Sequence, residues 1–173
     1  MKQLLAPSHY LKPLLFLAVG MWPALLAFPG YADITGEVVR VADGDTITVL
    51  DSTNTQHKIR LTGIDAPERG QPFGTVSRDH LSSLLAGKQV QVLSDRRDRY
   101  GRVLGKVILN GVDVNLAQLN AGMAWWYRYY AESQPPEDRT SYELAEDTAR
   151  AGSFGLWSEP DAIPPYDWRK GQR

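Results

Sequence analysis

The stretch that decides the fold is VVRVADGDTITVL, residues 38–50. Runs of β-forming residues lie on both sides of an Asp-Gly pair at 43–44, a pattern typical of two strands joined by a two-residue type I′ hairpin. The aspartate of that pair needs no role beyond the turn. Asp45 is different, because strand alternation puts it on the face that carries Ile47 and Val49, where a carboxylate is unexpected. The alternative for Asp45 is a solvated strand end.

Strands and helices follow one another in a recognisable order after this hairpin. Apolar and β-branched runs bounded by turn residues predict strands, and apolar residues at helix spacing, ended by glycine, predict helices. The predicted strands lie at 34–41, 46–50, 56–64, 89–93 and 103–109, and the predicted helices at 73–85, 114–121 and about 141–151. This order predicts a fold class that is mainly β with α, a five-stranded OB-fold (oligonucleotide-binding) Greek-key barrel with about three helices.

The first 32 residues have the features of a signal peptide. Two lysines accompany a mostly apolar stretch at 13–28, which is shorter than the about 20 apolar residues of a membrane span and is interrupted by Pro23. Gly30 and Ala32 are small residues of the kind that a signal peptidase requires, so cleavage is predicted after Ala32. We therefore expect export to the periplasm or the extracellular space, without membrane contact after cleavage. An uncleaved membrane anchor is the alternative.

The composition of the remaining chain limits its chemistry. Its length suits one compact domain, predicted over 33–158, followed by an extended Pro-containing tail at 159–173, and the protein is expected to be a monomer. The absence of cysteine excludes disulfides, cysteine nucleophiles and cysteine-ligated zinc. The net charge of −1 becomes more negative when the two lysines of the leader are removed, so a polyanion must be bound by a local cluster of arginines.

Four short motifs carry the candidate chemistry. They are DGDT at 43–46, RLTGIDAPE at 60–68, DRYGR at 98–102 and GMAWWYRYY at 122–130. In this order and at this spacing they resemble the staphylococcal nuclease family, and the resemblance extends through the C-terminal GLW to the tail PPYDWRK. It implies an OB barrel that hydrolyses DNA and RNA with calcium and low sequence specificity. The bond to the 5′ oxygen would be cut, which leaves 3′-phosphate ends.

The resemblance also assigns a metal site and a base. By position, Asp45 and Asp65 match the metal-binding carboxylates, and the backbone carbonyl of Ala66 matches a further ligand. Calcium prefers six to eight oxygen ligands, so such a site leaves several positions for water and for a phosphate of the substrate. Glu68 matches the residue that takes a proton from the attacking water.

The substrate-binding residues follow in the same way. Arg60 and Arg102 match two phosphate-binding arginines, whose forked hydrogen bonds suit the extra charge of a phosphodiester under attack. Tyr100 and Tyr130 match positions near the bound nucleotide. Single strands are the expected preference, since an OB surface stacks exposed bases that a duplex hides.

Simpler interpretations stand beside these. Asp65 and Glu68 are also spaced like a helix capping box, and a lone arginine on a strand face, as at Arg60, is usually solvated. The paired tryptophans at 125–126 are better explained as core than as base-stacking platforms. The alternative function is a non-catalytic OB-fold module that binds nucleic acid or protein. Three acids beside a polyanion disfavour that alternative, because without a metal they repel it.

Overall fold

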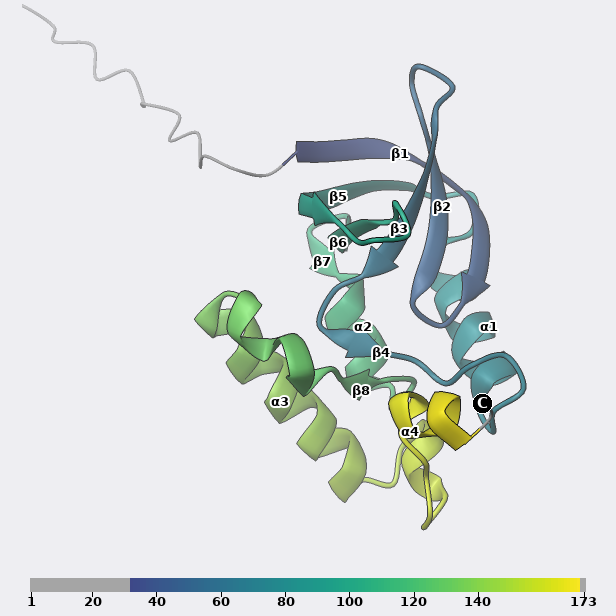
Figure 1. Cartoon of the computed structure of the whole chain (residues 1–173), viewed down its shortest axis with the longest axis vertical. Coiled ribbons are helices and arrows are strands. Elements are labelled where there is room, and N and C mark those ends of the chain that lie inside the picture. Colours follow the sequence, from purple (N-terminus) through teal and green to yellow (C-terminus); the bar gives the residue numbers. More distant parts are fainter. Residues whose placement is uncertain (1–31, 172–173) are drawn as a thin grey trace, which may run out of the picture.

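The computed structural model describes residues 32–171 of the 173-residue chain (Figure 1). The predicted signal peptide lies outside these residues, except for Ala32 at the start of the first strand. None of the helices in the described part is long and apolar enough to cross a bilayer.

A closed five-stranded barrel forms the upper part of the molecule in Figure 1. Strand β1 pairs antiparallel with β2 on one side and with β5 on the other, β2 pairs with β3, and β5 pairs with β6. A parallel pairing of β3 with β6 closes the barrel, which confirms the OB-fold prediction. The strands are β1 (Ala32–Asp43), β2 (Thr46–Asp51), β3 (Gln56–Leu61), β5 (Gln89–Arg97) and β6 (Val103–Leu109).

Smaller elements surround the barrel. Three strands have two residues each: β4 (Ile64–Asp65) pairs with β8 (Trp125–Trp126), and β7 (Val112–Asp113) pairs antiparallel with β6. The helices α1 (Gly74–Leu85), α2 (Val114–Asn120) and α3 (Pro136–Ala151) fulfil the prediction of about three helices. Two 3₁₀ segments, η1 (Arg128–Ser133) and η2 (Gly155–Ser158), and a fourth helix, α4 (Pro165–Gly171), complete the chain.

The tail was predicted to be extended, and for residues 165–171 this is wrong because they form α4. Pro165 stands at the first helical position, where its missing N–H group costs no hydrogen bond. Asp167 near the start of the helix and Arg169 and Lys170 near its end have the charges that the helix dipole favours. Figure 1 shows α4 beneath the barrel, beside the loop that leads into α1.

The type I′ turn predicted at 43–44 is also wrong. Because Asp43 pairs with Thr46, the two loop residues are Gly44 and Asp45, and neither has the positive φ that a type I′ turn requires at both positions. Gly44 is needed for space instead, since a Cβ there would overlap the hydroxyl group of Ser77 in α1. The tip of this hairpin is therefore packed against the first helix.

The barrel interior is filled by aliphatic side chains that alternate along the strands. Its fully buried members include Ile47, Val49, Ile59, Val92 and Val107. Buried leucines of α1 and α2 belong to the same core cluster. This packing fixes the ends of β2 and β3, where the polar cluster described next is located.

Candidate active site

A guanidinium group joins two buried carboxylates at the end of β3. Arg60 Nη1 lies 2.8 Å from Asp45 Oδ2, and Arg60 Nη2 lies 2.9 Å from Asp65 Oδ1. Its Nη1 also donates to the carbonyl oxygens of Leu61 and Ile64. The Arg60 side chain is only 14 % exposed, so the solvated-surface interpretation is wrong. Both carboxylates therefore meet on one cationic group.

The turn that follows β3 brings Asp65 back to Arg60. The strand predicted over 56–64 ends at Leu61, because Gly63 has a φ of 74° and turns the chain. Strand β4 then runs beside β8, with Asp65 opposite Trp125. The tryptophans of β8 are buried, which confirms their predicted packing role.

Asp45 lies in the loop between β2 and β1 but is buried, so the solvated-end interpretation is wrong. Its Oδ2 accepts a hydrogen bond of 2.7 Å from the backbone N–H of Ala66. Burial raises the pKa of Asp45, Arg60 opposes this shift, and the neighbouring carboxylates of Asp43 and Asp65 add to it. This balance means that further positive charge near Asp45 is favourable.

Glu68 lies in the loop between β4 and α1, with its side chain 40 % exposed. The capping-box interpretation of Asp65 and Glu68 is wrong, because α1 begins only at Gly74, and its N-cap residue, Phe73, makes no side-chain cap. The backbone N–H of Glu68 donates to the side chain of Gln71 instead. The Glu68 carboxylate is thus free of any helix-capping role.

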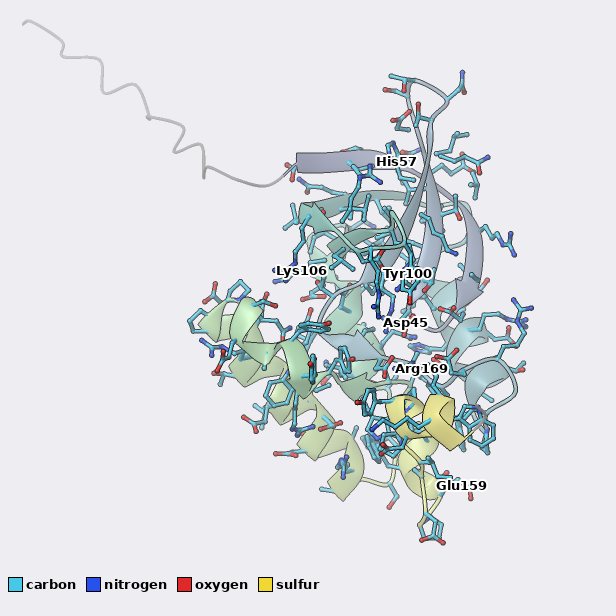
Figure 2. The ribbon with its side chains drawn as sticks, in the orientation of Figure 1. Asp45, His57, Tyr100, Lys106, Glu159 and Arg169 are labelled. Atoms are coloured by element: carbon cyan, nitrogen blue, oxygen red, sulfur yellow. The ribbon has the colours of Figure 1, made fainter. Side chains whose placement is uncertain are left out.

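Arg169 of α4 completes the cluster, and it was not among the predicted site residues. Its Nη1 lies 2.6 Å from Glu68 Oε1, and its Nη2 lies 3.0 Å from Asp65 Oδ2. Burial lowers the pKa of Arg169, but the hydrogen bonds to Asp65 and Glu68 raise it above the ordinary value, so the group stays cationic. In Figure 2, Arg169 extends from α4 toward the barrel on the side where Asp45 lies. Its separation of 101 residues from Glu68 left no local sequence signal.

Tyr127 is a second residue near the cluster that the sequence left without a role. Its backbone N–H donates to the carbonyl of Gly63, which places it beside the turn that carries β4. Burial raises the pKa of Tyr127, and the charge of Asp65 adds to this shift. Its phenol group therefore lies within electrostatic reach of the carboxylate cluster.

The second predicted arginine lies on the neighbouring strand. Parallel pairing of Ile59 with Val103 puts Arg102 beside β3, and a φ of 77° at Gly101 confirms the predicted tight turn. The side chain of Arg102 makes an ion pair with Asp98, with 2.7 Å between Nε and Oδ2. Within residues 32–171, no hydrogen bond or ion pair joins Arg102 to the carboxylates on Arg60 and Arg169.

The two predicted tyrosines are both exposed. The ring of Tyr100 lies 5.7 Å from the guanidinium carbon of Arg102. Tyr130 belongs to an aromatic group with Tyr127 and Tyr129, and its ring centroid is 5.4 Å from that of Tyr127. Both rings are thus accessible to a nucleobase of a substrate, although neither ring contacts the carboxylates.

The residues that could hold a metal ion supply hard oxygen donors. In the described part of the chain, no group of three or more His, Cys, Asp or Glu residues is arranged around a possible metal position. The carboxylates of Asp45 and Asp65 nevertheless converge on the guanidinium of Arg60, and Ala66 adds a neighbouring backbone carbonyl. Oxygen donors of this kind fit Ca²⁺ and do not fit a soft metal.

The fold and this cluster define an OB-fold protein with an acid and arginine site at one edge of the barrel. Residues 58–159 match the model of a family described as "Staphylococcal nuclease homologue". The chain is 44 % identical over 158 residues to a micrococcal nuclease of Shigella flexneri, covering 86 % of this chain and 88 % of the relative. It is 45 % identical over 156 residues to an "Uncharacterized endonuclease" of Escherichia coli, covering 90 % and 94 %. The chain belongs to the staphylococcal nuclease family.

This membership establishes the general activity. The protein is an endonuclease of the micrococcal nuclease type, whose substrate is nucleic acid. Nucleases of the family typically use Ca²⁺, and the oxygen donors of Asp45 and Asp65 are compatible with that ion. The non-catalytic alternative is not supported.

Proposed function

We propose that this endonuclease is exported and hydrolyses phosphodiester bonds of DNA and RNA with calcium, with low sequence specificity, and leaves 3′-phosphate ends. The observation that carries the proposal is the convergence of Asp45 and Asp65 on the guanidinium of Arg60. Two buried carboxylates beside a phosphate-binding arginine suit a reaction in which an anionic substrate must be held beside a cation.

In this proposal, calcium is bound by the carboxylates of Asp45 and Asp65 and by the backbone carbonyl of Ala66. When bound, the ion supplies Lewis-acid chemistry and a template for the phosphate. The hydrogen bond from the Ala66 N–H to Asp45 fixes the Asp45 carboxylate before any ion arrives. Fixed ligands reduce the reorganisation that binding requires.

Arg60 and Arg102 bind the phosphate and stabilise the charge that develops on it. In the absence of substrate each arginine is paired with a carboxylate, Arg60 with Asp45 and Asp65, and Arg102 with Asp98. A guanidinium carries five N–H donors in a rigid fork, so it can bind a phosphate oxygen through donors that the carboxylate leaves free. Arg102 is the more accessible of the two side chains.

Glu68 acts as the base that takes a proton from the attacking water. Its exposed carboxylate can reach water, and it shares Arg169 with Asp65, which puts it on the same side of the site. Tyr100 and Tyr130 contact the nucleotide, since both rings are exposed and available for stacking. Their accessible faces favour unpaired strands.

Processing follows the sequence prediction, with cleavage after Ala32 and a catalytic domain over 33–158. N-terminal sequencing of the protein recovered outside the cytoplasm tests this step. A residue-33 start is expected, and recovery of the intact chain with Met1 in the membrane fraction would contradict it.

The activity is tested with the purified mature protein on single-stranded DNA, duplex DNA and RNA, with calcium or with excess chelator. The expected result is calcium-dependent cleavage, fastest on single strands, with 3′-phosphate ends identified by mass spectrometry. Products with 5′-phosphate ends would contradict the proposed chemistry, and faster cleavage of stable duplex would contradict the strand preference.

A further inference from the structure

The C-terminal helix α4 covers the carboxylates of the candidate active site. The Arg169 guanidinium contacts both oxygens of Asp65, at 3.2 Å from Oδ1 and 3.0 Å from Oδ2, and it contacts Glu68 Oε1 at 2.6 Å. With Arg60 on Oδ1 as well, both oxygens of Asp65 already accept from arginines. Any ion that binds Asp65 therefore competes with these contacts.

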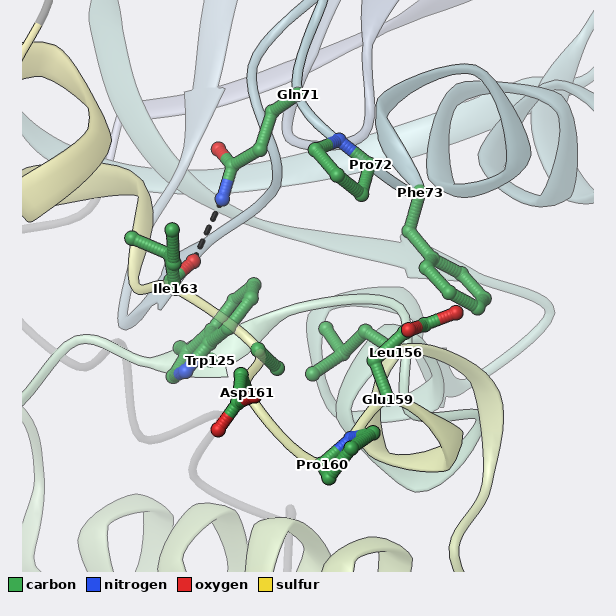
Figure 3. A pocket seen from close by; sticks show the side chains of 10 residues that line it. Gln71, Pro72, Phe73, Trp125, Leu156, Glu159, Pro160, Asp161 and Ile163 are labelled. Atoms are coloured by element: carbon green, nitrogen blue, oxygen red, sulfur yellow. Dashed lines mark hydrogen bonds between the residues drawn. The ribbon is translucent and has the colours of Figure 1, made fainter.

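The attachment of α4 to the rest of the molecule is slight. The helix has seven residues, which is too short to be stable without tertiary contacts. The segment before it is held by a hydrogen bond of 2.6 Å from the Gln71 side chain to the carbonyl of Ile163 (Figure 3). Beside this bond, the tail segment 159–163 lines a cavity of about 130 Å³ with Trp125 and Leu156.

A cavity beside a segment reduces the packing contacts that hold the segment in place. Among the residues that the structure describes, the polar contacts of segment 160–171 with the body are the Gln71 bond and the Arg169 contacts. The Arg169 side chain is 37 % exposed, so water weakens its ion pairs and makes them easier to exchange. The tail is thus held in place by the ion pairs of Arg169. A cation that binds Asp65 more strongly can displace the guanidinium.

We propose that α4 is an autoinhibitory strap. Arg169 and calcium cannot both bind Asp65, so the docked helix opposes calcium binding. This inference rests on the proposed function, in which Asp65 is a calcium ligand and Glu68 the base. Calcium binding releases Arg169 from Asp65 and Glu68, and α4 then leaves the site, so that the Glu68 carboxylate is no longer paired with a guanidinium. By linkage, the strap lowers calcium affinity by the same factor by which calcium weakens the docking of α4.

The test compares calcium binding by the wild-type protein with that by two variants of equal charge change. Arg169→Gln removes the contact with the carboxylates, whereas Lys170→Gln removes a charge whose ammonium group lies over the Tyr166 ring, 4.2 Å from its centroid. Titration calorimetry with calcium chloride is expected to give about tenfold tighter binding for Arg169→Gln, within the range usual for coupled sites. Lys170→Gln is expected to bind calcium as the wild type does.

A second readout follows the helix itself. Hydrogen exchange of the amides at 166–171 in the wild-type protein is expected to become faster when calcium is added, while exchange in the barrel strands becomes no faster. Arg169→Gln should show the faster exchange already without calcium. Arg169→Lys, which keeps the charge but loses the fork, should fall between wild type and Arg169→Gln in both measurements.

The outcomes separate the two proposals. Equal calcium affinity in wild type and Arg169→Gln would overturn the strap and leave the proposed function intact. Unchanged calcium affinity together with weaker nucleotide binding by Arg169→Gln would also overturn it and assign Arg169 to the phosphate. If no form of the protein binds calcium, the proposed function is wrong and the strap with it.

Discussion

At the scale of single residues, Arg60 has two tasks that its neighbours define. Its guanidinium balances the buried carboxylates of Asp45 and Asp65, and it also donates hydrogen bonds to two backbone carbonyls. Removing one partner of a buried ion pair leaves the other charge uncompensated, which strongly lowers the free energy of unfolding. The same residue is therefore important for stability without metal, and in the proposed function it also binds the phosphate during turnover.

Arg60→Ala is expected to lower the free energy of unfolding by about 3 to 5 kcal/mol in chelator, because the buried carboxylate of Asp45 loses its guanidinium partner and Asp65 keeps only that of Arg169. Calcium should restore part of this loss, since it supplies the missing positive charge and binds only the folded state. Urea unfolding with and without calcium measures both effects. Arg78→Ala, which removes an exposed arginine of α1, is the control and should change neither. An equal loss with and without calcium would contradict the metal assignment.

Glu68→Gln is expected to separate catalysis from binding. If Glu68 takes the proton from water, turnover should fall by roughly 10² to 10⁴ while nucleotide binding and stability change little. Glu143→Gln, at an exposed glutamate of α3, is the matched control and should cleave at the wild-type rate. Single-turnover cleavage beside equilibrium binding gives the answer. A Glu68→Gln variant that cleaves normally would mean that the base is another group.

Asp98 provides a prediction for pH. Burial alone raises its pKa, but hydrogen bonds from the side chain and the backbone of Arg102 lower it below the ordinary value of 3.8. A carboxylate with a lowered folded-state pKa stabilises the protein above its unfolded-state pKa and loses that effect as the pH falls through the folded-state pKa. Asp98→Asn should therefore destabilise the protein at pH 7 and progressively less below 3.8. A destabilisation independent of pH would contradict this ion pair.

At the scale of elements, the short pieces between strands position the site. The turn at Gly63 reverses the chain after β3 so that β4 carries Asp65 back to Arg60. The hairpin tip at Gly44 packs on Ser77 of α1 and presents Asp45 from the other side. The cluster thus depends on two glycines, one for its backbone angle and the other for close packing.

Gly63→Ala is expected to lower the free energy of unfolding by more than about 1 kcal/mol, since its φ is positive and a Cβ would overlap the Gln134 side chain. It should also weaken calcium binding, because Asp65 moves. Gly111→Ala is the control, with a φ of 81° but open space around its Cβ. Gly111→Ala should lower the free energy of unfolding but leave the calcium affinity unchanged. Unchanged calcium affinity in a destabilised Gly63→Ala variant would show that this turn does not position the site.

The same elements show what the sequence could predict. Strand β6 was predicted with its observed bounds, because an apolar run of this length between turn residues is typical of a strand. The break at 62–63 was missed, since a single glycine inside a strand pattern also fits a continuous strand. The Asp-Gly pair at 43–44 suggested a turn type that its packing against α1 does not allow.

At the scale of the whole molecule, the site is assembled from segments far apart in the chain. The order of strands and helices predicted the barrel and the order of the motifs predicted the family, and the acids and Arg60 do meet at the barrel edge. Arg169 could not be predicted, because a lone arginine in a charged tail carries no sign of the carboxylates it will contact. A contact of this kind depends on tertiary folding and not on local pattern.

The central claim, that Asp45 and Asp65 form the calcium site of a nuclease, is tested most directly by the calcium dependence of single-stranded DNA cleavage by the wild type and by Asp65→Asn. The wild type is expected to be half-saturated at about 10⁻⁴ to 10⁻³ M calcium, the range of weak, open calcium sites, and inactive in excess chelator. Asp65→Asn is expected to need far more calcium. Undiminished cleavage by the wild type in chelator, or an Asp65→Asn variant with the wild-type calcium dependence, would contradict the claim.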